Sequence, residues 1–123
     1  MLINSPAVDN SNKWADGGYL STSMDLVKMC QSILKNNFIS TASKKILWSP
    51  AVLKSGKETN YGIGWRINKD KQNRTFVHHG GSAVGGRSFL LMYPDKGIVV
   101  AITSNLSDSF NEDFVLKIAE MFL

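Results

Sequence analysis

Two apolar runs in the second half of the chain, joined by four residues, place the strongest constraint on its fold. Residues 87–93 and 98–103 are rich in aliphatic, aromatic and β-branched side chains, and each is long enough for a strand. The segment Pro94-Asp95-Lys96-Gly97 joins them and has turn chemistry at every position. Strands joined by so short a turn run antiparallel. With a further strand over residues 75–79, the sequence predicts three antiparallel neighbours.

A fourth strand is predicted over residues 61–67, where the hydrophobic period is two. Ile63, Trp65 and Ile67 alternate with smaller or polar residues, a pattern that puts the apolar side chains on one face of a sheet. Residues 68–74 are polar or charged and predict an exposed hairpin connection to the next strand.

Helical periodicity flanks this region on both sides. A helix is predicted over residues 23–34, opened by a capping box in which Thr22 is followed by Asp25. A shorter helix is predicted over residues 41–47 and a closing helix over residues 111–123. The apolar face of the closing helix comprises Phe114, Val115, Ile118, Ala119 and Phe122. The predicted fold class is α+β: an antiparallel sheet of three to four strands with a packed C-terminal helix and N-terminal helices.

Composition excludes several classes of protein. The chain has 123 residues, 43% of them hydrophobic, which leaves room for one domain. A net charge of +4, spread evenly, does not indicate a nucleic-acid binder. One cysteine and two histidines make neither an internal disulfide nor, by themselves, a zinc site, so no metal or other cofactor is expected. No stretch approaches the roughly 20 apolar residues of a membrane span.

The most unusual local sequence is residues 78–86, which hold both histidines and four of the ten glycines. Glycines at the end of a strand let a ligand or another backbone approach closely. Adjacent strand residues point to opposite faces, so either His78 or His79, but not both, faces a given site. The residues alone leave open an ordinary surface or core histidine beside a glycine-rich turn.

Two other candidate groups are weaker. Ser32-Ile33-Leu34-Lys35 matches the S-x-x-K spacing of a serine nucleophile and its lysine. It lies at the end of a predicted helix rather than at the start, and a chain with this many serines and lysines produces about one such match by chance. Cys30 lies on the apolar face of the same helix and is interpreted as core filling rather than a reactive thiol.

Four segments in order, GGYLSTSMDLVKM, YGIGW, HHGGSAVGG and FLLMYPDKGIVVAITSN, resemble the C-terminal part of the serine β-lactamase and penicillin-binding-protein family, class C branch. The resemblance covers nearly the whole chain. It implies that residues 1–123 are the C-terminal portion of a single β-lactamase-like domain. Within it, residues 1–20 would be irregular, 21–50 helical, 61–105 antiparallel strands and 110–123 the closing helix.

The resemblance also implies roles for four residues of the family's third motif, which would be His79-Gly80-Gly81-Ser82. His79 resembles the motif's cation or hydrogen-bond donor near the substrate carboxylate and the catalytic tyrosine. The backbone N–H of Ser82 resembles one arm of the oxyanion hole, and Gly80 and Gly81 line the substrate. Donors fixed on a rigid strand stabilise charge in the transition state without reorganisation.

The sequence departs from the family pattern in two ways. Gly80 stands where the motif usually has a threonine, so a hydroxyl is missing. Moreover, none of Tyr19, Tyr61 and Tyr93 is followed by Asn two positions later, as the family's second motif requires. Acyl transfer needs a nucleophile and a base within hydrogen-bond reach. The chain is therefore interpreted as a fragment of a serine acyl-hydrolase that holds one wall of the active site and is inactive alone.

Two alternatives remain open: a non-catalytic binding or assembly module on the same scaffold, and a small autonomous domain whose His-Gly loop binds an anion. The expected partners are a small-molecule or peptide substrate in the parent protein, and the missing N-terminal half or a second copy of the chain. No nucleic acid is expected. The opening residues are similar to a mitochondrial, serine protease-like branch of the family, and a mitochondrial location is implied by that resemblance alone.

Overall fold

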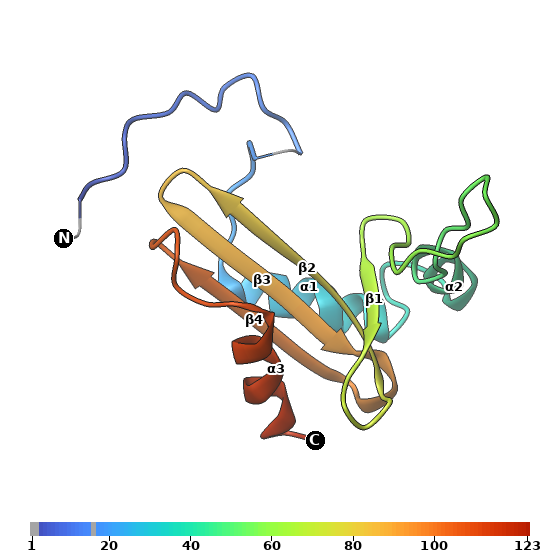
Figure 1. Cartoon of the computed structure of the whole chain (residues 1–123). Helices are drawn as coiled ribbons and strands as arrows, with labels where there is room; N and C mark the ends of the chain where they lie inside the picture. The colour runs from blue at the N-terminus through green and yellow to red at the C-terminus, as the bar shows by residue number, and fades with distance from the viewer. Residues whose placement is uncertain (1–2, 16) are drawn as a thin grey trace.

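A four-stranded antiparallel sheet forms the centre of the molecule, as the sequence predicts. The computed structural model describes residues 3–15 and 17–123. The strands are β1 (Arg66–Lys69), β2 (Thr75–Ala83), β3 (Gly86–Tyr93) and β4 (Ile98–Ser104), and they pair in the order β1-β2-β3-β4. Each strand therefore pairs with its neighbour in sequence, and the sheet is a simple meander (Figure 1). The predicted turn between the last two strands contains a short 3-10 helix, η1 (Pro94–Lys96).

Three helices accompany the sheet: α1 (Ser23–Leu34), α2 (Thr41–Leu47) and α3 (Glu112–Glu120). The first two confirm the predicted bounds. Thr22 caps α1 by accepting a hydrogen bond from the Asp25 backbone N–H, the arrangement expected of the capping box. Among the described residues, no helix is long and apolar enough to cross a membrane.

The sheet is covered on both faces. Figure 1 shows α1 behind the sheet and α3 in front of it, and the buried side chains form two clusters accordingly. One cluster joins α3 to the sheet: Phe76, Phe89, Leu91, Tyr93, Val115 and Ala119. The other joins α1 to the sheet: Cys30, Val77, Leu90 and Met92. Coverage on both faces explains why β3 is a continuous apolar run rather than an alternating one.

The prediction of a strand over residues 61–67 is wrong for residues 61–65. There the chain forms a tight loop, and β1 begins only at Arg66. The backbone N–H of Ile63 donates to the carbonyl oxygen of Leu47 (2.9 Å), so the loop is tied to the end of α2. Ile63, expected on the buried face, is 60% exposed. The alternation of apolar residues here belongs to a loop and not to a strand. The contact with Leu47 that shapes this loop cannot be predicted from the local hydrophobic period.

Smaller differences concern the ends of the chain. The closing helix α3 ends at Glu120, short of the predicted end at residue 123. Val115 and Ala119 are buried as predicted, whereas Phe114 and, beyond the end of the helix, Phe122 are exposed. The predicted irregular segment over residues 1–20 has no helix or strand where the structure describes it. Residues 1, 2 and 16 of that segment lie outside the described residues.

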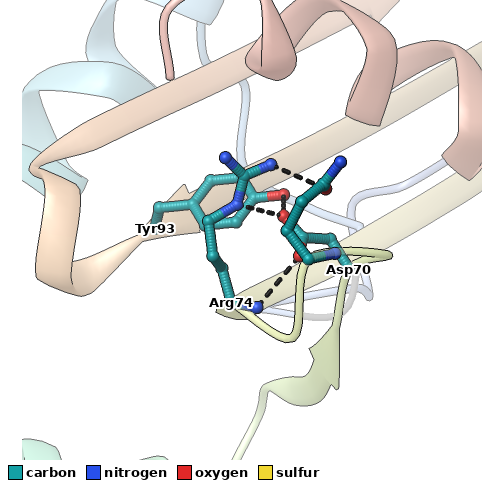
Figure 2. Close-up of polar contacts among 4 residues, drawn as sticks. Asp70, Arg74 and Tyr93 are labelled. Carbon is teal, nitrogen blue, oxygen red and sulfur yellow. Dashed lines mark hydrogen bonds and ion pairs between the residues drawn. The ribbon is translucent and has the colours of Figure 1, made fainter.

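The hairpin between β1 and β2 is closed by a buried carboxylate (Figure 2). Asp70 Oδ1 accepts the backbone N–H groups of Gln72 and Arg74, both at 2.9 Å. Its Oδ2 accepts Arg74 Nε at 2.6 Å and the hydroxyl of Tyr93 at 3.0 Å. The Asp70 carboxylate thus links the tip of the hairpin to the end of β3 and fixes β1 beside β2.

Candidate active site on strand β2

The two adjacent histidines of β2 occupy different environments. His78 is 1% exposed and lies on the α3 face of the sheet, among the aromatic side chains of that cluster. His79 points to the opposite face and is exposed. The pleat of the strand imposes this separation, since successive side chains alternate. His79 is therefore the histidine of this pair that a substrate can reach.

His78 is held as a structural group. Its ring stacks on Phe89, with ring centres 5.3 Å apart and an interplanar angle of 12°. The side-chain amide of Asn68 lies 3.1 Å from His78 Nε2, and Asn60 donates to the other end of that amide at 2.9 Å. Nδ1 is buried and has no hydrogen-bond partner among the described residues. Burial lowers the pKa of His78, and the Glu112 carboxylate, 3.9 Å away, opposes that effect only in part.

Within the described part of the chain, His79 makes one side-chain hydrogen bond, to a partner that the sequence did not reveal. The hydroxyl of Tyr61 lies 2.9 Å from His79 Nε2, and the two rings meet edge to face with centres 6.0 Å apart. The guanidinium of Arg66 lies over the Tyr61 ring at 5.6 Å. Tyr61 and His79 are 18 residues apart, and neither periodicity nor spacing indicates the contact.

The loop that carries Tyr61 is rigidly built. The Tyr61 carbonyl oxygen accepts the backbone N–H of Ala51 at 2.9 Å, and its own N–H donates to the Thr59 hydroxyl at 3.2 Å. Gly62 packs so closely against Leu47 that any side chain there would collide with the Leu47 carbonyl oxygen. Gly62, in the YGIGW segment, was therefore the one signal in the sequence that the chain beside Tyr61 is closely packed.

Beyond His78, one side of β2 is an open edge. Arg66 is the last β1 residue paired with β2, and its partner is His78. The N–H of Ile67 bonds away from β2, so the backbone of Arg66 faces β2. Because backbone groups alternate along a strand, the N–H groups of Gly80 and Ser82 face the same side as that of His78, where the described residues supply no further strand. These donors are available to a ligand.

The first glycine of the motif has a packing reason. A Cβ added at Gly80 would lie 3.0 Å from Cδ2 of Phe89, the ring that stacks on His78. A threonine in its place would press on this stack. Gly81 and Ser82 are exposed. The structure thus places His79, Gly80, Gly81 and Ser82 together on one strand, with the side chain of His79 on one face and a packed surface behind Gly80.

Two hollows lie on the opposite face of the sheet from the His79 side chain. A pocket of about 470 Å³ is lined by Gly80, Gly81 and Ser82 together with His78, Arg66 and Arg87, among others. A pocket of about 580 Å³ lies between the β1–β2 hairpin and α3. Neither includes His79, so the α3 face is not the side on which its ring could meet a substrate.

The other candidates from the sequence are not part of this site. Ser32 lies half-buried in the last turn of α1, and Lys35 caps the end of that helix. Cys30 is fully buried in the cluster beneath α1, and burial raises the pKa of its thiol to about 11. This confirms that Cys30 fills the core, because an unreactive thiol is what such burial produces.

Residues 3–120 match the family model described as Beta-lactamase. The chain belongs to the beta-lactamase family. Its relatives include the serine beta-lactamase-like protein LACTB, mitochondrial, of Mus musculus and of Homo sapiens, each 31% identical over 98% of this chain and 29% of the relative. Penicillin-binding protein 4* of Bacillus subtilis is 30% identical over 88% of this chain and 24% of its own length. The chain thus spans less than a third of these relatives.

A solved structure supports the fold assignment. The D-stereospecific amidohydrolase from Streptomyces sp. superposes with a TM-score of 0.64 at 20% sequence identity, over 79% of this chain and 29% of that one. The four-stranded sheet and its helices are therefore part of a beta-lactamase-type fold. The resemblance inferred from the motif segments is confirmed at the level of family and fold.

Proposed function

We propose that this chain supplies one wall of the active site of a serine acyl-hydrolase, with the serine nucleophile contributed from outside these 123 residues. The substrate class is an amide or ester, in a small molecule or a peptide, cleaved through an acyl-serine intermediate. The observation that carries the proposal is the combination on β2 of an exposed, hydrogen-bonded His79 and an outward-facing Ser82 N–H.

Each group has a defined task in this chemistry. The tetrahedral intermediate of acyl transfer places negative charge on the former carbonyl oxygen, and a backbone N–H such as that of Ser82 stabilises it. His79 donates a hydrogen bond to the substrate from a fixed position. Gly80 and Gly81 let the substrate lie along the open edge of β2, as an added strand would.

The absence of a hydroxyl at Gly80 limits how the substrate is held. A threonine hydroxyl is the usual family group at this position, and the Phe89 ring leaves little space for it here. Recognition of a substrate carboxylate then depends more on His79. Substrates without a carboxylate at that position lose less by the change.

A first experiment tests the chain alone. Among the described residues, no serine side chain is hydrogen-bonded to a basic side chain, so the isolated chain should form no acyl-enzyme with penicillin-like or fluorophosphonate probes. Intact mass spectrometry with peptide mapping measures this. Stoichiometric labelling of Ser32 would contradict the proposal.

The histidine assignment is tested in a protein that joins this chain to the serine-bearing portion. His79→Ala should lower kcat/KM by about 10²-fold, equivalent to some 2.7 kcal/mol of transition-state stabilisation. The matched control is His78→Gln, which should cost less than about tenfold because His78 faces the packed side of the sheet. Equal losses in the two variants would show that the wrong histidine has been assigned.

A further inference from the structure

The hydrogen bond between Tyr61 and His79 leaves one ring nitrogen of His79 for the substrate. Nε2 lies 2.9 Å from the Tyr61 hydroxyl. Among the described residues, no hydrogen bond joins His79 Nδ1 to the protein, and the side chain is exposed. The nitrogen that can meet a substrate is therefore Nδ1, and its chemistry depends on where the proton of the neutral ring resides.

The chemistry of the pair decides the position of that proton. A phenol O–H is a stronger acid than a neutral imidazole N–H, and an imidazole nitrogen is a far stronger base than a phenol oxygen. An O–H···N bond from Tyr61 to His79 is therefore favoured over the reverse N–H···O bond. The Arg66 guanidinium packs over the face of the Tyr61 ring and helps to hold the phenol in this position.

We infer that Tyr61 is a positioning residue that holds neutral His79 as the Nδ1–H tautomer, so that His79 presents a donor to the substrate whether or not the ring is charged. When the ring takes up a proton from solvent, the proton binds Nε2, and the Tyr61 hydroxyl turns to accept from it. The exposed Nδ1–H is unchanged by this step. Only the role of the Nδ1–H as a donor to the substrate rests on the proposed function.

The hydrogen bond from Tyr61 determines whether His79 offers the substrate a donor or an acceptor. A lysine at this position of the motif would donate hydrogen bonds throughout the neutral pH range. A histidine with its proton on Nε2 would instead turn the lone pair of Nδ1 toward an anionic substrate. With the Tyr61 bond, the histidine keeps the donor character of a lysine. The rigid loop around Tyr61, tied to Ala51, Thr59 and Leu47, keeps the phenol where this bond needs it.

Nitrogen-15 NMR of the imidazole rings tests the inference on the chain as it stands. At a pH where the ring is neutral, His79 should show Nδ1 as the protonated, pyrrole-type nitrogen and Nε2 as the pyridine-type one. A His79→Gln variant assigns the signals by their loss. Tyr61→Phe keeps the aromatic ring beside His79 and removes the hydroxyl, so the signals should move toward the Nε2–H form that free histidine favours.

Tyr19→Phe is the matched control, since it removes a phenol hydroxyl from an exposed position in the N-terminal segment. The tautomer of His79 should be the same in this variant as in the wild type. A wild-type ring with its proton on Nε2, or a tautomer unaltered by Tyr61→Phe in a chain with an otherwise native amide spectrum, would overturn the inference.

The result is separable from the proposed function because the spectrum needs no substrate. In the protein that carries the serine, Tyr61→Phe should lower kcat/KM, but by less than His79→Ala does. If His79→Ala leaves hydrolysis unchanged while the NMR result holds, the proposed catalytic role fails and the tautomer assignment stands. If the tautomer is the other one while His79→Ala abolishes hydrolysis, the reverse is true.

Discussion

Two histidines that are neighbours in sequence differ in almost every physical property. His78 is packed between Phe76 and Phe89 and hydrogen-bonded to Asn68, whereas His79 is exposed and bonded to Tyr61. Strand alternation predicts that the two side chains separate. Which of them is buried depends on which face carries the aromatic cluster, and that is set by the whole sheet. The side chain of His78 therefore stabilises the fold, and that of His79 is free to act on a ligand.

The burial of His78 predicts a pH dependence of stability. Its pKa is lowered because burial disfavours the charged ring, so the unfolded chain binds more protons below the ordinary value of about 6.5. The stabilisation is complete above that pH and declines as the pH falls toward the lowered folded pKa. Urea unfolding between pH 7.5 and 4.5 should show this decline, and His78→Gln should show a shallower one.

A variant that loses as much stability over this range as the wild type would contradict the assignment. The contribution of Asp70 to stability does not interfere with this measurement, because it changes only at lower pH. Burial raises the pKa of this carboxyl, but hydrogen bonds from Arg74, Tyr93 and Gln72 outweigh that effect and hold it below its usual range. Its stabilisation is therefore present above about pH 3.9 and is lost below it.

The strand pairing of the β1–β2 hairpin involves the four residues of β1, and the Asp70 carboxylate accepts four further hydrogen bonds. Asp70→Ala leaves Arg74 Nε and the buried Tyr93 hydroxyl without their acceptor, and the guanidinium keeps its bond to Gln72. It should destabilise the chain by about 3 kcal/mol, and Tyr93→Phe by about 1 kcal/mol. Chemical denaturation measures both. Asp95→Ala, at an exposed turn, should stay within about 0.5 kcal/mol, and an equal loss there would refute this role for Asp70.

The elements that the sequence predicts well are those determined by local signals. The capping residue Thr22 and the turn segment at Pro94 mark their boundaries directly, and α1, α2 and the turn before β4 follow. The loop at Gly62 was not predictable, because its conformation comes from contact with Leu47. The extension of β2 through Gly80 was missed for a similar reason: pairing with β3 overrides the local preference of glycine for turns.

The candidate site likewise has a part that could be predicted from local sequence and a part that could not. The motif residues His79 to Ser82 could be identified from the sequence, since they are contiguous. The contact with Tyr61 and the crowding of Gly80 by Phe89 could not, because both join residues that are distant in the chain.

β4 is one of the two outer strands of the sheet, and β1 is the other. The seven residues of β4 include neither a proline nor a charged residue, and both α1 and α3 contact it. Among the described residues, no strand pairs with its outer side. An added strand would bond to this edge and lie between the helical layers, which supports the proposal that the chain binds a missing portion of the fold or a second copy of itself.

The expected result is self-association of the isolated chain at micromolar concentration. Thr103→Lys places a charge on the edge strand and should shift the chain toward the monomer, as lysines do on natural edges. Gln72→Lys adds the same charge at the exposed hairpin and should not. Light scattering with sedimentation velocity measures the change. A wild-type chain that remains monomeric and does not bind an added N-terminal portion would exclude the proposed pairing.

Strand β3 is protected from amide hydrogen exchange in two ways. It is paired along its length with β2 on one side and β4 on the other, and its buried residues from Phe89 to Tyr93 contribute to both hydrophobic clusters. Its amide hydrogens can therefore exchange with solvent only when the sheet itself comes apart. The loop at Tyr61 lies outside this core, where backbone hydrogen bonds to Ala51 and Leu47 hold it. Its amide hydrogens should therefore exchange before those of β3.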